Sequence, residues 1–184
     1  DSPFSGLDKI VMQADKILTM GWASSGTSRP IALARFTEAG EIDNTFGSNG
    51  TFFIDPHPTL GAVGSALSVS PAGKIIVVGI VPYLSSQDGG GMYLTCLHAN
   101  GSIDSGFGPY GTGYVFNNDC CFFNAPKILF QADQKIIVGG SQSFGIGLSR
   151  FSSAGIPDSS FGYNGAYRGK YEGTVTRGSV NDMV

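Results

Sequence analysis

Charged side chains are scarce in this chain of 184 residues, where lysine and arginine together number 11 and aspartate and glutamate 14. They make up 14% of the sequence, whereas about 25% is typical of globular domains. The formal net charge is -3 and no run of basic residues occurs. Nucleic-acid binding depends on clustered lysine and arginine that displace counterions from phosphates. The composition therefore predicts no nucleic-acid partner.

The side chains that enzymes use as acids and bases are also few. Glutamate occurs only as Glu38, Glu41 and Glu172. The two histidines, His57 and His98, lack the spacing of metal ligands. No pair of residues resembles a general acid with its base. We therefore expect no catalytic residue, no metal centre and no cofactor.

Long apolar runs are absent too. The longest one, Ile75 to Val81, is far shorter than the roughly 20 residues that cross a bilayer as a helix, so we expect no membrane insertion. The chain starts at Asp1 without a signal-peptide pattern, as expected of a processed or excised form.

Glycine, by contrast, is abundant, at 28 of 184 residues. Much of it belongs to a repeat. A Lys-Ile-Leu or Lys-Ile-Ile motif begins at Lys16, Lys74 and Lys135. A second motif follows each of these and consists of an aspartate, two further residues and a Phe-Gly pair. Its members are Asp43, Phe46 and Gly47; Asp104, Phe107 and Gly108; and Asp158, Phe161 and Gly162.

Two motifs that recur in the same order define three units, about residues 1–55, 56–117 and 118–184, within a single repeat domain. Each unit holds four short apolar segments bounded by turn residues, which is typical of strands. In unit two these are residues 67–69, 75–78, 92–97 and 113–116. No stretch has the 3.6-residue spacing of a helix. Four short strands in each unit predict an all-β fold of three propeller-like blades with antiparallel strands.

The repeated aspartates stand in tight turns, where a carboxylate accepts hydrogen bonds from nearby backbone N–H groups. This predicts a structural role. Calcium binding is the alternative, but calcium takes six to eight oxygen ligands and each turn offers one carboxylate. The repeated phenylalanines are interpreted as anchors that pack each turn onto its own blade. The glycine after each of them permits a positive φ.

Arginine precedes two of these aspartates by eight residues, as Arg35 before Asp43 and Arg150 before Asp158. This spacing joins the third strand of a unit to the turn that follows it. We predict a bidentate ion pair in both units, because the guanidinium fork matches a carboxylate.

Unit two has Cys96 where the other units have arginine, so Asp104 lacks this partner. The chain has three cysteines, which permit one disulfide and one leftover thiol. We hypothesise that Cys96 compensates for the arginine by forming a disulfide with Cys120 or Cys121. Three unpaired thiols are the alternative.

The units resemble the delta-60 repeat, a bacterial β-propeller-like repeat. The similarity rests on residues 71–75 (Pro-Ala-Gly-Lys-Ile), residues 33–36 (Leu-Ala-Arg-Phe) and the three pairs of Asp and Phe-Gly, and it covers almost the whole chain. It implies a secreted or surface-exposed bacterial protein and carries no catalytic residues to transfer. We therefore expect an extracellular or cell-surface location.

Propellers close with four to eight blades, so three blades leave two open apolar faces. We predict that oligomerisation, as a ring or a filament, or further chain completes the propeller. The predicted function is that of a non-catalytic structural or adhesive module that binds copies of itself, with a protein or glycan as a further partner. The alternative is a propeller-based hydrolase whose central channel holds acids such as Glu172, Asp119 or Asp55.

Overall fold

The computed structural model describes residues 4–24, 29–55, 63–81, 91–117, 124–142 and 145–170. These residues form twelve strands and no helix, as predicted, and they therefore contain no helix that could cross a membrane. The strands are β1 (Gly6–Gln13), β2 (Lys16–Trp22), β3 (Ile31–Phe36), β4 (Thr51–Ile54), β5 (Val63–Val69), β6 (Ile75–Val81), β7 (Gly91–Leu97), β8 (Tyr114–Asn117), β9 (Asn124–Phe130), β10 (Ile136–Gln142), β11 (Gly145–Phe151) and β12 (Ala166–Lys170).

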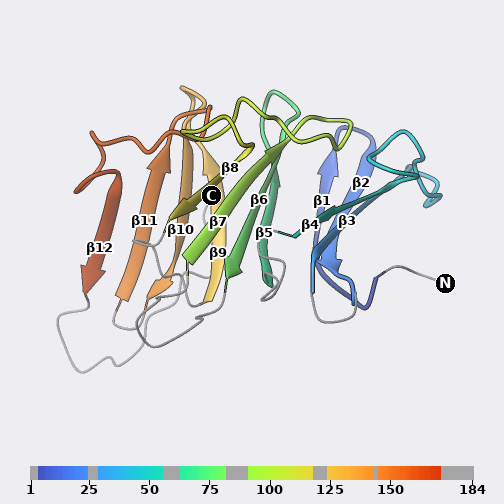
Figure 1. The fold of residues 1–184 in the computed structure, drawn as a ribbon, viewed down its shortest axis with the longest axis horizontal. Coiled ribbons are helices and arrows are strands. Elements are labelled where there is room, and N and C mark those ends of the chain that lie inside the picture. The colour runs from blue at the N-terminus through green and yellow to red at the C-terminus, as the bar shows by residue number, and fades with distance from the viewer. Residues whose placement is uncertain are drawn as a thin grey trace.

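The strands form three separate four-stranded sheets, in the orders β1-β2-β3-β4, β5-β6-β7-β8 and β9-β10-β11-β12. All pairs are antiparallel. We call these sheets blades 1, 2 and 3. They stand side by side in chain order, as Figure 1 shows. The first strands of neighbouring blades lie closest, since β1 contacts β5 and β5 contacts β9. The predicted all-β architecture of three four-stranded blades is confirmed.

Strand β6 shows how the middle blade packs against both of its neighbours. Its residues Ile75, Ile76, Val77 and Val78 are all buried, as predicted for a strand covered on both faces. Side chains along a strand alternate between its two faces. Ile75 and Val77 accordingly join a core shared with blade 1, while Ile76 and Val78 join a core shared with blade 3. Two inter-blade cores therefore hold the three blades together.

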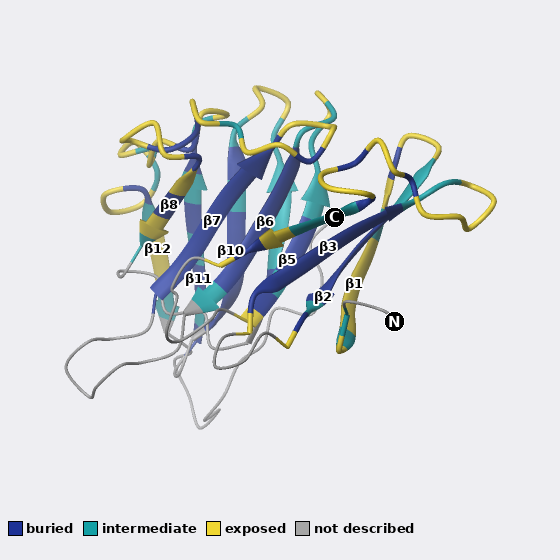
Figure 2. Cartoon of the chain, turned by 45° about the vertical axis from the view of Figure 1, so that its right-hand side comes forward, coloured by how far each residue is buried: buried dark blue, intermediate teal, exposed yellow. Residues whose placement is uncertain are grey.

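The end blades are covered less evenly. The central strands are buried, whereas β1 and the turns along one edge of the blades are exposed (Figure 2). Strand β11 alternates strictly between buried and partly exposed residues. One face of blade 3 is therefore packed against blade 2, and its other face has no neighbouring blade among the described residues.

Candidate functional site

The same polar cluster recurs in the turns of blades 1 and 3. Arg35 Nε donates to Asp43 Oδ2 at 2.8 Å. Arg150 Nε donates to Asp158 Oδ2 at 2.9 Å. The predicted ion pairs are therefore confirmed, but only one arginine nitrogen binds each carboxylate. The bidentate geometry was wrong because the Arg35 Nη2 donates to the hydroxyl of Thr45 instead.

The Nη1 of Arg35 points away from its own turn and contacts blade 2. It donates to the backbone carbonyl of Ala99 and, at 2.9 Å, to the Oε1 of Gln13. The Nε2 of Gln13 in turn donates to the carbonyls of Gly73 and Ala99, at 3.1 and 3.3 Å. Gln13 and Arg35 are both buried. We call these two residues the polar clasp, because they join blade 1 to two turns of blade 2 through charge-assisted hydrogen bonds.

Phe46 also crosses to blade 2. It is fully buried, and a Cβ added to Gly101 would lie 2.7 Å from its ring. The following backbone N–H, that of Gly47, donates to the carbonyl of Asn100 at 2.8 Å. We call this Phe-Gly pair the aromatic clasp. The interpretation of Phe46 as an anchor for its own blade was incomplete, because the ring rests on a glycine of the next blade.

Blade 2 holds blade 3 through a second aromatic clasp. Phe107 is buried, and a Cβ on Gly155 would lie 2.6 Å from its ring. Gly108 N donates to Ala154 O at 2.8 Å. The glycines of all three Phe-Gly pairs have positive φ, as predicted, at 53°, 90° and 57° for Gly47, Gly108 and Gly162.

Asp104 in blade 2 has no arginine partner but pairs with a lysine instead. Lys74 Nζ lies 2.6 Å from its Oδ2, and Gly106 N donates to its Oδ1. The Lys74 hydrogen bond holds the pKa of Asp104 below its ordinary value. The lysine of the first repeat motif therefore replaces the missing arginine. Lys135 occupies the same position in blade 3 and also reaches Asp158, at 3.2 Å.

Cys96 is a free, buried thiol in this structure. Its Sγ lies 3.9 Å from the Oδ2 of Asp104. Burial, and then the nearby carboxylate, raise the pKa of Cys96 to about 12, so the thiol is protonated and unreactive at neutral pH. Cys120 and Cys121 lie outside the described residues, so the disulfide stays a prediction. It is not needed to compensate for the arginine, because Lys74 already balances Asp104.

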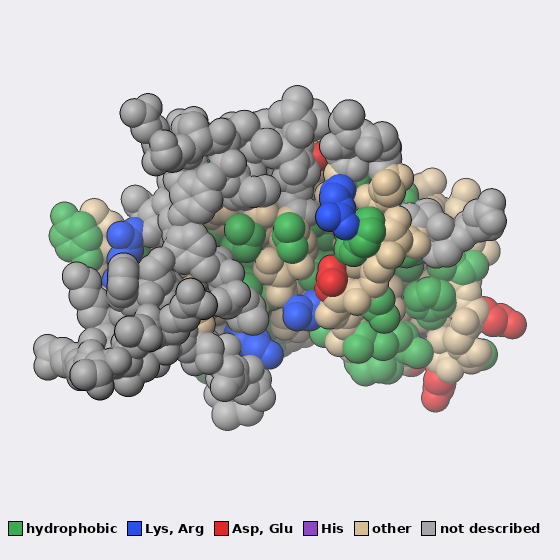
Figure 3. All heavy atoms as spheres, turned by 90° about the horizontal axis from the view of Figure 1, so that it is seen from below, with side chains coloured by type: hydrophobic (Ala, Val, Ile, Leu, Met, Phe, Trp, Pro, Cys, Tyr) green, Lys and Arg blue, Asp and Glu red, His purple; other side chains and the backbone are tan. Residues whose placement is uncertain are grey.

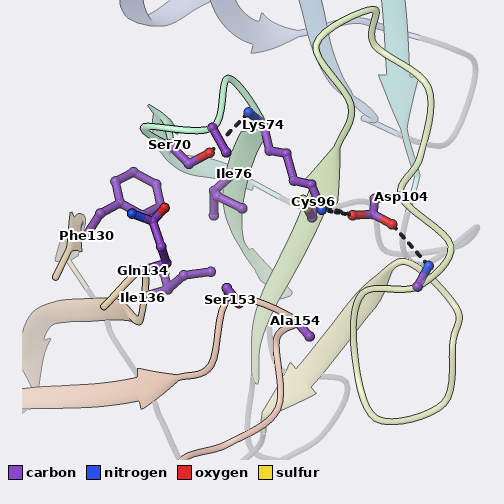
Figure 4. A pocket seen from close by; sticks show the side chains of 12 residues that line it. Ser70, Lys74, Ile76, Cys96, Asp104, Phe130, Gln134, Ile136, Ser153 and Ala154 are labelled. Carbon is purple, nitrogen blue, oxygen red and sulfur yellow. Dashed lines mark hydrogen bonds and ion pairs between the residues drawn. The ribbon is translucent and has the colours of Figure 1, made fainter. Parts of the chain in front are cut away.

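A pocket of about 440 Å³ lies between blades 2 and 3 at the place of the missing polar clasp. Figure 4 shows the Lys74–Asp104 pair beside Cys96 on one wall. The strand registers place Cys96 at the position of Arg35 and Ser70 at that of Gln13. Two short side chains thus replace two long ones. We call the contact between blades 1 and 2 the first joint and that between blades 2 and 3 the second joint. The pocket in the second joint is the space that the polar clasp fills in the first.

The polar groups of the repeated turns are paired with one another. The carboxylates of Asp43 and Asp158 accept hydrogen bonds from neighbouring hydroxyl and guanidinium groups. No three His, Cys, Asp or Glu side chains that could hold a metal ion lie together in the described part of the chain. Asp55 is exposed and follows β4, at the sheet edge opposite β1. His57, Asp119 and Glu172 lie outside the described residues.

Comparison with known families agrees with this geometry. Residues 13–46 and 71–107 match the model of a family described as a domain of unknown function (DUF5122) beta-propeller. The first matched segment begins at Gln13 of the polar clasp and ends at Phe46 of the aromatic clasp. The second ends at Phe107, which belongs to the second aromatic clasp. The chain is thus similar to a β-propeller repeat family over these segments. The comparison with curated proteins gave no match.

We expect the free energy of unfolding to fall in acid. The carboxyl pKa values of Asp43, Asp104 and Asp158 are all lowered in the folded state, chiefly by hydrogen bonds from Thr45, Lys74 and Ser160. A lowered pKa stabilises the fold fully above the unfolded value of about 3.9, and this contribution is lost as the pH falls toward the folded value. Urea unfolding should show level stability from about pH 7 to about 5 and a decline below about pH 4. Equal stability at pH 7 and well below pH 3 would contradict this.

Cys96→Arg is expected to stabilise the fold by about 1 kcal/mol, because it fills the pocket and restores half of the polar clasp. Blade 3 shows that an arginine and a lysine fit together on one aspartate, as Arg150 and Lys135 both contact Asp158. Urea unfolding would measure the gain, and Cys96→Met, which adds volume without hydrogen bonds, is the control. A Cys96→Arg protein less stable than the control would refute this origin of the pocket.

Proposed function

We propose that the chain is a non-catalytic, extracellular structural or adhesive module that works by joining its end blades to the blades of a second copy. The burial of equivalent residues in the three blades carries this proposal. The forward face of a blade is the face that meets the next blade in the chain. The backward face meets the blade before it.

The forward faces of blades 1 and 2 bury four equivalent positions. In blade 3 the same positions are apolar but only partly buried. The four are Leu18, Ile31, Leu33 and Phe46 in blade 1; Ile76, Met92, Leu94 and Phe107 in blade 2; and Ile137, Ile146, Leu148 and Phe161 in blade 3. Blade 3 therefore presents the same apolar surface that packs against a neighbour in both internal joints.

The backward face of blade 1 is open in the same way. Ile10 and Met12 are 62% and 59% exposed. Their equivalents in blade 2, by strand register, are Leu67 and Val69. Both lie in or against the core shared with blade 1, where Leu67 is buried. Apolar surface of this kind marks an interface, and a further blade has the matching shape.

The repeat resemblance supports a place outside the cell, and the apolar surface supports association with another protein. Seen from below, the described surface shows groups of apolar side chains and few charged ones (Figure 3). The resemblance to the delta-60 repeat implies a secreted or surface-exposed bacterial protein without shared catalysis. A protein or glycan bound by the loops is a second partner of the same module. Removal of the protein from intact cells by an added protease would test the location.

Solution mass tests self-association directly. Two copies of the 19.2 kDa chain supply six blades, within the usual range of about four to eight. Sedimentation equilibrium should therefore give a mass that rises above that of the monomer. Met12→Lys places a charge on the open face and should reduce association, whereas Tyr110→Lys, at an 87% exposed turn position, should not. A chain that stays monomeric at every concentration overturns the proposal.

A further inference from the structure

We infer that blade 3 carries a preformed clasp for blade 1 of a second copy, so that copies join head to tail. This rests on the proposed function and names the contacts that perform it. In each internal joint the earlier blade supplies the clasp residues, which we call the grip. The later blade supplies the turn that accepts their hydrogen bonds and the phenylalanine ring, which we call the seat. Blades 1 and 3 carry one of these halves each, on faces that have no neighbouring blade among the described residues.

Blade 3 repeats the complete gripping set of blade 1. The strand and turn registers align the two sets position by position. The blade 1 set is Gln13, Arg35, Asp43, Thr45 and Phe46, and the blade 3 set is Gln131, Arg150, Asp158, Ser160 and Phe161. Blade 2 lacks the polar part, since it has Ser70 and Cys96 instead. The full set therefore occurs on blade 1, which packs against blade 2, and on blade 3, whose forward face has no neighbouring blade among the described residues.

Several atoms of the blade 3 set lack the partners that their blade 1 equivalents have. Gln131 Oε1 is buried and has no hydrogen-bond partner, whereas Gln13 Oε1 accepts from Arg35. Gly162 N and the Nη1 of Arg150 have no partner among the described residues. Among these atoms only Gln131 Oε1 is buried, and a buried acceptor without a donor costs free energy, whereas Gly162 is exposed. The donor to Gln13 Oε1 is Arg35 Nη1, and its equivalent in blade 3 is Arg150 Nη1. A blade seated on this face would supply carbonyl acceptors to both N–H groups.

Blade 1 carries the matching seat, and it is empty in the described structure. Its turn places Glu38, Ala39 and Gly40 where blade 2 has Ala99, Asn100 and Gly101, the residues that the first joint engages. The glycines of the three seats differ in their surroundings: Gly101 and Gly155 are buried against a phenylalanine ring, while Gly40 is exposed with nothing within 4 Å of an added Cβ. The carbonyls of Glu38 and Ala39 accept no hydrogen bond among the described residues.

The joint between copies follows from the internal ones. Phe161 rests on Gly40, Gly162 N donates to Ala39 O, and Arg150 Nη1 donates to Glu38 O. The two halves differ, so the contact is heterologous and each copy has one of each. Two copies that close on each other form two such joints, and each copy grips and is gripped once.

A complementation experiment tests this direction. Phe161→Ala removes the gripping ring but leaves the seat, and Gly40→Asn blocks the seat but leaves the grip. Gly40 has φ +80° and open space around it, and asparagine tolerates this conformation better than most residues. Each variant alone should associate at least about tenfold more weakly than wild type. An equimolar mixture should form a one-to-one dimer in sedimentation velocity that grows no further, because it holds one intact grip and one intact seat.

Two matched variants control for local effects. Gly111→Asn introduces the same residue at φ +64° in an exposed turn, where an added Cβ would meet only Ser105 O at 3.5 Å, so its backbone strain is close to that of Gly40→Asn. Tyr163→Ala removes an 83% exposed aromatic ring from the turn that holds Phe161. Both should associate as wild type does. Circular dichroism would verify that all four variants keep the β-sheet fold.

The outcomes separate this inference from the proposed function. A wild-type chain that stays monomeric overturns both. A wild type that associates, with Phe161→Ala and Gly40→Asn unaffected, overturns the head-to-tail clasp and leaves self-association standing. A mixture no larger than the separate variants likewise overturns the clasp alone.

Discussion

Replacing Phe46 with alanine is expected to lower the free energy of unfolding by about 3–5 kcal/mol, as for other fully buried phenylalanines. The side chain is 0% exposed and lies between its own blade and Gly101 of the next one. The glycine has no side chain that could move into the space, so the cavity would stay open. The change therefore loosens the joint between blades 1 and 2 as well as the turn that carries the ring.

Phe161→Ala is the matched control, because it removes the same side chain from the same repeat position. Phe161 is partly exposed and rests on no glycine of a following blade among the described residues. Its loss should cost about 1 kcal/mol, typical of a substitution that opens no large cavity. Urea unfolding at a concentration where the chain is monomeric would measure both. Equal losses would mean that Phe46 stabilises only its own blade.

Arg35→Ala is expected to cost at least about 3 kcal/mol, because it leaves a buried carboxylate without its cation. The side chains of Arg35 and Asp43 are 9% and 8% exposed. The substitution also leaves the Oε1 of Gln13 unpaired and removes a donor from the carbonyl of Ala99. Four polar groups therefore lose hydrogen bonds, those of Asp43, Thr45, Gln13 and Ala99, and Asp43 and Gln13 are buried where water reaches poorly.

The corresponding change in blade 3 separates the ion pair from the inter-blade contacts. Arg150→Ala breaks the same pair with Asp158, but Arg150 contacts no other blade among the described residues and Lys135 remains beside the carboxylate. We expect a loss of about 1 kcal/mol or less. Chemical denaturation of both variants under one set of conditions would give the difference. A loss as large for Arg150→Ala as for Arg35→Ala would show that the inter-blade hydrogen bonds add nothing.

The two internal joints differ in kind, and one substitution in the repeat explains why. Both have the aromatic clasp, but only the first has the polar one. With Cys96 in place of arginine, Lys74 becomes the partner of Asp104 and a pocket remains between blades 2 and 3. The proposed joint between copies would have the full set of the first.

The repeat and its strands could be predicted from the sequence alone. The predicted segments 75–78 and 92–97 lie within β6 (Ile75–Val81) and β7 (Gly91–Leu97), because glycine turns and apolar runs act over a few neighbouring positions. The ion pairs of Arg35 and Arg150 could also be predicted, since each joins residues only eight apart in one unit. The fold class follows from the same local features, repeated three times.

The tertiary structure alone decided what the repeated residues contact. Phe46 and Phe107 each meet a glycine about 50 residues further along, Gly101 in the first joint and Gly155 in the second, and the Arg35 guanidinium reaches Ala99. Spacing within a unit does not encode such contacts, because they depend on how one blade stacks on the next. The threefold repeat predicted the fold of three blades, and the scarcity of charge predicted the absence of a nucleic-acid partner. Only the stacking of its blades distinguished a filled joint from an empty one.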